Sequence, residues 1–169
     1  MRSVIAFVAC VGILVLVNLS IAEKERQLES GTRVYLELAP VDPRSLMQGD
    51  YMALQFAVAN SARSALQRPA PEDPRHIDLP PSDGRMIATV DSKGVATYRR
   101  IDDGKALEPD EIYLRYRVRR GEIKFATNAF FFEEGTAERY EQARYGEFRV
   151  AKDGELLLTG MRGKDLEPL

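Results

Sequence analysis

A run of apolar residues opens the chain, and its length predicts a transmembrane helix. From residue 4 to residue 22 only Asn18 and Ser20 are polar, and both lie near the end of the run. A helix of roughly 20 apolar residues spans the hydrocarbon core of a bilayer. Residues 23–31 are mostly charged or polar and end at Gly31, where a helix can stop, so they are predicted to form a juxtamembrane helix or linker.

Beyond this linker, apolar positions alternate with polar ones, which predicts one β-rich domain over residues 32–169. In the first such segment, Val34, Leu36 and Leu38 alternate with Arg33 and Glu37, as in a half-buried strand. Short turn-forming sequences connect many of the segments, which indicates antiparallel pairing. The pattern predicts strands at residues 34–38, 52–58, 86–90, 95–99, 111–119, 123–126, 147–151 and 155–159.

Two segments depart from the strand pattern and predict short helices. Residues 59–67 can form one or two helical turns, and Thr136 can cap a second helix in which Tyr140 lies on the apolar face. Between the first of these helices and the strand at residues 86–90, the proline-rich residues 68–83 predict an exposed loop in which His76 is solvated. The fold class expected is mainly β, an antiparallel curled sheet or small barrel of about eight strands with one or two short helices, plus the N-terminal transmembrane helix.

The charges around the apolar run predict the orientation of the chain. Arg2 and the amino terminus precede the run, whereas the charges after it are balanced, so the positive-inside bias favours a cytoplasmic N-terminus at residues 1–3. Residues 4–22 would then contact membrane lipid and residues 32–169 would be exported. One alternative is that the run is a signal peptide cleaved after Ala22.

Composition narrows the classes of function. The formal net charge is −2 and no lysine- or arginine-rich block is present, so no nucleic-acid partner is expected. The single cysteine, Cys10, lies in the apolar run, and the domain therefore has no internal disulfide. With one histidine, a zinc or copper cluster is not expected, while a carboxylate site for calcium or magnesium stays open. No cofactor, no metal site and no catalytic residue is predicted.

The segment from Leu38 to Phe56 carries a motif, Gly49-Asp50-Tyr51-x-x-Leu54-x-Phe56. This motif resembles the signature of the bacterial GDYXXLXY family, with Phe56 where the signature has tyrosine. An N-terminal anchor, the run Phe131-Phe132-x-Glu134-Gly135 and a closing hairpin extend the resemblance over nearly the whole chain. The resemblance implies that the protein is anchored in the bacterial inner membrane, has a periplasmic domain and accompanies a polytopic membrane protein. It implies no catalytic residues.

The motif also has a physical interpretation of its own. Pro43 fixes φ and favours an extended conformation at Asp42, while Gly49 permits a positive φ and Asp50 can accept amide hydrogen bonds where a strand begins. The motif would then be a shaped strand entry, with Tyr51, Leu54 and Phe56 packing in the strand. The alternative is a polar surface recognised by a partner. That surface would comprise Asp42, Arg44, Asp50 and Tyr51.

A row of basic residues follows the clearest strand pattern. The row faces outward on a predicted hairpin that turns at Arg120-Gly121, and it consists of Arg115, Arg117, Arg119, Arg120 and Lys124. Such a row can be a solvated sheet face or a charged edge that blocks aggregation. The alternative is a contact with anionic lipid headgroups or an acidic partner, since a membrane tether would keep the domain close to the bilayer.

Three functions are consistent with the sequence. The favoured one is a non-enzymatic accessory subunit of a polytopic membrane protein. The second is a hydrolase, because Pro43-x-x-Leu46-x-x-Gly49-Asp50 is similar to a segment of type I signal peptidases; Ser45 would be its nucleophile, with His76 or a lysine as base. Those lysines are Lys93, Lys105 and Lys124. The third is a ligand site in the mouth of a barrel, lined by Tyr51, Phe56, Tyr113, Tyr116 and Phe125.

Overall fold

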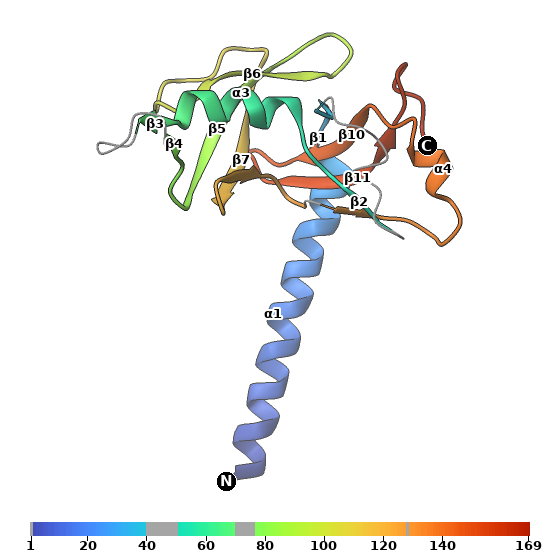
Figure 1. Ribbon diagram of the computed structural model, residues 1–169. Coiled ribbons are helices and arrows are strands. Elements are labelled where there is room, and N and C mark those ends of the chain that lie inside the picture. The colour runs from blue at the N-terminus through green and yellow to red at the C-terminus, as the bar shows by residue number, and fades with distance from the viewer. Residues whose placement is uncertain (1, 40–50, 70–76, 128) are drawn as a thin grey trace.

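Figure 1 shows the computed structural model of the chain, which describes residues 2–39, 51–69, 77–127 and 129–169. One helix projects from a β-rich domain, and the C-terminus lies within that domain (Figure 1). Several residues singled out above lie outside the described residues, so their predictions stay as stated. They are Asp42, Pro43, Arg44, Ser45, Leu46, Gly49, Asp50 and His76.

The projecting helix, α1, covers Arg2–Ser30 without a break. Its apolar run is not buried against the rest of the structure, and residues 3–30 are long and apolar enough to cross a membrane, as predicted. The helix ends at Gly31, whose amide donates to the carbonyl of Gln27 at 2.9 Å. A Cβ at Gly31 would lie 2.5 Å from that carbonyl oxygen, which explains the glycine at this stop.

The first sheet joins the beginning of the domain to its end. Strand β1 (Thr32–Glu37) pairs antiparallel with β10 (Tyr145–Val150), which pairs antiparallel with β11 (Leu156–Arg162). The predicted turn at Asp153-Gly154 connects the last two strands, and Gly154 has φ +89°. Because β1 follows α1 directly, this sheet attaches the domain to the helix.

The second sheet has the order β6-β5-β7-β8 and is antiparallel throughout. Its strands are β5 (Ser82–Val90), β6 (Ala96–Ile101), β7 (Glu111–Arg119) and β8 (Glu122–Lys124). Arg120 and Gly121, with φ 55° and 72°, form the tight β7–β8 turn, since both central residues of such a hairpin turn need positive φ.

Two backbone contacts curl these sheets around a common core. Tyr35 of β1 donates its amide to Gly94 at 2.8 Å, and Arg115 of β7 donates to Gly154 at 2.7 Å. Side chains from both sheets fill the space between them and are fully buried, among them Leu36, Leu114 and Phe148. The mainly antiparallel curled fold predicted from the sequence is therefore confirmed.

Short elements complete the described part of the chain. Strand β2 (Tyr51–Ala53) pairs with β9 (Ala129–Phe131), and β3 (Arg68–Pro69) pairs with β4 (Ile77–Asp78). The two short helices are α3 (Ala57–Leu66) and α4 (Ala137–Tyr140), close to the predicted segments.

The strand predicted at residues 52–58 is wrong beyond Ala53. Strand β2 ends at Ala53, and Val58 lies in α3. Val58 and Ala62 are both buried, and their spacing of four residues places them on one face of the alanine-rich helix. An apolar residue at position 58 fits both the two-residue period of a strand and the period of a helix. Burial of Val58 together with Ala62 favours the helix.

Three smaller predictions also need correction. The alternating pattern of residues 111–119 predicts that Glu111 faces outward, but its side chain is buried and pairs with Arg100. The hydroxyl of Thr136 donates to the carbonyl of Glu133 at 2.6 Å instead of capping the amides of α4. Ser82 and Asp83 belong to β5 and not to the preceding loop, because they pair with β7.

Candidate functional site

The two segments that carry the family resemblance lie side by side in the structure. In the β2–β9 ladder Tyr51 is opposite Phe131 and Met52 is opposite Phe130. The rings of Tyr51 and Phe131 are 5.7 Å apart, and Phe131 is 74% exposed. The motif tyrosine thus supports an aromatic side chain that points into solvent.

The second half of the motif packs in the core. Leu54 and Phe56 are 7% and 3% exposed. The ring of Phe56 meets Phe148 edge-on at a centroid distance of 5.4 Å and Phe125 at 5.9 Å. For these two motif positions a packing role explains the residue types.

A family model described as "GDYXXLXY protein" matches residues 13–161, which is most of the chain. The chain belongs to the GDYXXLXY family. No curated protein and no solved structure matches it. The match includes most of the α1 helix and both segments that pair in the β2–β9 ladder of this GDYXXLXY protein.

The basic row has partners along most of its length. Arg119 pairs with Asp83 at 2.7 Å, and its guanidinium holds the pKa of Asp83 below the ordinary value. Arg115 reaches Asp153 at 3.2 Å and Lys124 reaches Glu122 at 3.4 Å. Within the part of the chain that the structure describes, Arg117 forms no ion pair and donates instead to the carbonyl of Ala126 at 3.4 Å.

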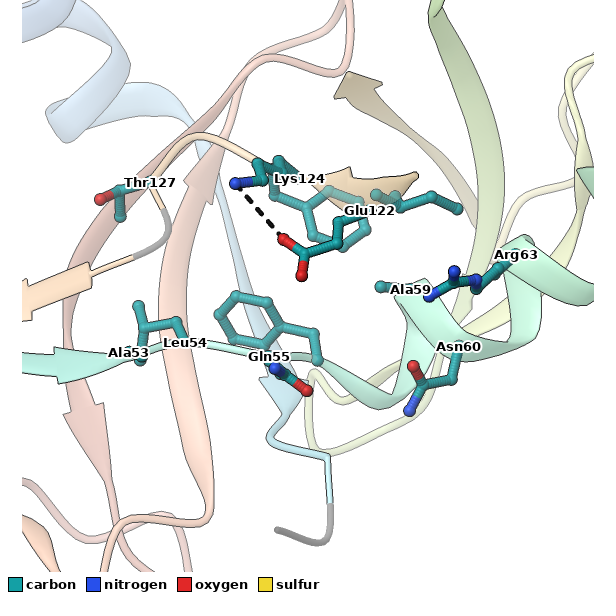
Figure 2. Close-up of a pocket in the computed structure, with 12 residues that line it drawn as sticks. Ala53, Leu54, Gln55, Ala59, Asn60, Arg63, Glu122, Lys124 and Thr127 are labelled. Carbon is teal, nitrogen blue, oxygen red and sulfur yellow. Dashed lines mark ion pairs between the residues drawn. The ribbon is translucent and has the colours of Figure 1, made fainter. Parts of the chain in front are cut away.

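A cavity of about 320 Å³ is lined by residues of both α3 and β8. Figure 2 shows Arg63 and Asn60 of α3 on one side of it, opposite Glu122 and Lys124 of β8, with Gln55 at the lower wall. Phe56 and Phe125, both buried, add apolar surface to its lining.

The five aromatic residues expected to line one ligand site do not gather there. Only Phe56 and Phe125 line the cavity beside α3. Tyr113 lies under the guanidinium of Arg85, which is 4.4 Å from the ring centroid. Tyr116 and Phe125 line a different groove, beside the end of α1.

The lysines named for a hydrolase lie apart from one another and are partly engaged. Lys105 pairs with Asp103 at 2.7 Å, and Lys124 pairs with Glu122. Lys93 is exposed in the β5–β6 turn, where its amide donates to the carboxylate of Asp91 at 2.8 Å. Among the described residues, no three or more His, Cys, Asp or Glu side chains are placed to hold a metal ion.

Sequence reasoning missed a polar contact between α1 and the domain. Gln27 is 6% exposed, and its side-chain amide donates to the carbonyls of Arg149 at 3.0 Å and Glu155 at 2.9 Å. One turn earlier, Lys24 pairs with Glu155 at 2.7 Å. The only signal in the sequence was an amide side chain among the charged residues of the linker, which does not reveal its partner.

Proposed function

We propose that this protein is a membrane-anchored, non-enzymatic accessory subunit of a polytopic membrane protein in the bacterial inner membrane. Residues 4–22 of α1 would be a retained signal anchor with a cytoplasmic N-terminus. The β-rich domain would lie in the periplasm and contact the partner close to the bilayer.

The observation that carries this proposal is the rigid attachment of the domain to α1. The helix continues to Ser30, and Gln27 and Lys24 bond its last turns to the β10–β11 hairpin. A flexible tether would let the domain tumble, whereas this attachment would hold one face toward the membrane. A fixed face at a fixed height suits docking on another integral membrane protein.

The β2–β9 ladder offers a surface for such docking. It lies on the side of the domain from which α1 emerges (Figure 1). Outside the apolar run, Leu28 and Phe131 are the large hydrophobic residues exposed in the described part of the chain. An exposed aromatic side chain, supported by its neighbour Tyr51, is a typical anchor of a protein interface.

The proposal is tested by mild detergent extraction of the full chain with a C-terminal tag, followed by identification of co-purifying proteins. We expect a stoichiometric polytopic membrane protein with the wild type and a loss of that protein with Phe131→Ser. Thr97→Ala, an exposed position on β6 in the four-stranded sheet, is the control and should retain the partner. Recovery of the wild-type chain alone in several mild detergents would contradict the proposal.

A further inference from the structure

A second hollow in the domain lies beside the end of α1. It is a groove of about 760 Å³, and its charged lining comprises four cations and three carboxylates. The cations are Lys24, Arg85, Arg115 and Arg117, and the carboxylates are Asp83, Asp153 and Glu155. We refer to this hollow as the basal groove.

The basal groove opens at the depth of lipid headgroups if α1 spans the bilayer. Lys24 follows the predicted span by two residues, which is roughly 3 Å along a helix axis. The headgroup layer extends about 5–7 Å beyond the hydrocarbon core on each side. The ends of β5 and β7 that carry Asp83 and Arg117 also lie on the α1 side of the domain (Figure 1).

The cations of the basal groove differ in how far they are neutralised. Lys24 and Arg115 pair with Glu155 and Asp153 in the groove itself. Arg85 is paired outside the groove, with Asp102 at 2.7 Å. Arg117 is exposed and forms no ion pair among the described residues, while Asp83, opposite it in the β5–β7 ladder, pairs with Arg119. With four cations and three carboxylates in its lining, the groove has one positive charge in excess.

The remaining lining is apolar and suits the part of a lipid next to its phosphate. Phe125, Leu156 and Leu157 contribute to it, together with the ring of Tyr116. Gly84 stands opposite Tyr116 in the β5–β7 ladder, and a Cβ there would lie 2.7 Å from the tyrosine hydroxyl. Glycine thus leaves the space that the Tyr116 ring occupies in the groove wall.

We propose that the basal groove binds the phosphate of an anionic phospholipid headgroup from the membrane that α1 crosses. Arg117 would bind the phosphate directly, and Lys24 and Arg115 would add positive charge to the same groove. Of the basic row seen in the sequence, only Arg115 and Arg117 take part, because Lys124 lines the cavity beside α3 instead. This site is separate from the Phe131 surface proposed for the protein partner.

The test is native mass spectrometry of the delipidated full chain in detergent, titrated with dioleoylphosphatidylglycerol. We expect one bound lipid per chain, with weaker binding of dioleoylphosphatidylcholine. Arg117→Gln should weaken phosphatidylglycerol binding about fivefold, the effect of one cation near a membrane surface. Asp153→Asn, which frees Arg115, should strengthen binding by a similar factor. Arg120→Gln removes the same charge outside the groove and is the control.

The proposal is overturned if Arg117→Gln and Arg120→Gln have the same effect, or if Asp153→Asn leaves binding unchanged. It is also overturned if millimolar inorganic phosphate displaces the lipid fully, since the groove would then recognise free phosphate. Melting of each variant in the same detergent shows that the fold is intact. Arg117→Gln should recover the protein partner as well as the wild type does. The lipid proposal and the proposal of an accessory subunit can therefore fail independently.

Discussion

Gln27 donates its side-chain amide to the backbone carbonyl of Arg149 at 3.0 Å, which joins the last turn of α1 to strand β10. The same amide nitrogen donates to the carbonyl of Glu155 at 2.9 Å. One buried side chain thus satisfies two carbonyls at the β10–β11 hairpin. Gln27 lies five residues after the apolar run, so its two bonds join the predicted span to the domain.

Replacing this amide should loosen the domain from the helix. We expect Gln27→Ala to lower the free energy of unfolding by roughly 1–3 kcal/mol, because the Arg149 carbonyl loses a buried donor and the Glu155 carbonyl retains only the Ala151 amide. Denaturant unfolding of the full chain in detergent measures the change. Gln55→Ala, at an exposed position, is the matched control and should change stability by less than about 0.5 kcal/mol. Equal effects of the two substitutions would mean that Gln27 does not hold the junction.

Substitution of the buried motif residue Phe56 should lower stability far more than substitution of Phe131, the exposed aromatic residue opposite Tyr51. Phe56 is 3% exposed and touches two other rings, so Phe56→Ala should cost about 3–5 kcal/mol. Phe131 is 74% exposed, and Phe131→Ala should cost less than about 1 kcal/mol. Thermal melting of both variants checks the difference. A large loss with Phe131→Ala would assign that ring to stability instead of to partner contact.

These contrasts show what could be predicted from the sequence. Local patterns predicted α1 and the turns at Gly121 and Gly154, since each depends on residues next to one another in the chain. The pairing of Thr32 with Val150 depends on packing between the two ends of the domain, and no local pattern encodes it. Burial of Gln27 escaped prediction for the same reason.

Acid should destabilise the domain partly through Glu111. Its side chain is 2% exposed, and the bond from the Arg100 guanidinium, with a second from the Glu108 amide, lowers its pKa from the ordinary value of 4.5. A carboxylate with a lowered folded-state pKa binds fewer protons than in the unfolded chain. The stability it contributes is therefore complete above pH 4.5 and is lost as the pH falls through the folded-state value.

We expect Glu111→Gln to melt at a lower temperature at neutral pH and to show a shallower fall in melting temperature below pH 4.5 than the wild type. Glu138→Gln, at an exposed position on α4, should keep the wild-type slope. Melting curves across this pH range measure both effects. If Glu111→Gln kept the wild-type slope, the paired carboxylate would not contribute to acid sensitivity.

The orientation of the chain can be tested directly. An enzyme that is active only in the periplasm should be active when fused after Leu169, and the mature protein should still contain Arg2. Retention is expected because the apolar run is long for a signal peptide. A mature N-terminus at Glu23 would identify the run as a cleaved signal peptide instead. The Lys24 and Gln27 contacts would survive that cleavage, so folding alone does not distinguish the two outcomes.

A position can require glycine because its φ is positive or because a neighbour leaves no room for a Cβ. Gly154, which lies against Tyr113, meets both conditions, and Gly104 meets only the first. Gly154 has φ +89°, and a Cβ there would lie 2.8 Å from the Cβ of Tyr113; Gly104 has φ +78° and open space around it. Gly104→Ala should therefore cost roughly 1 kcal/mol, the strain of a left-handed backbone alone. Gly154→Ala adds a steric clash with β7 and should cost about 3 kcal/mol or more. Denaturant unfolding of the two variants gives the difference. Equal losses of unfolding free energy would show that backbone strain accounts for both positions. The β10–β11 turn and β7 would then move apart enough to accept the added Cβ without a measurable loss of stability.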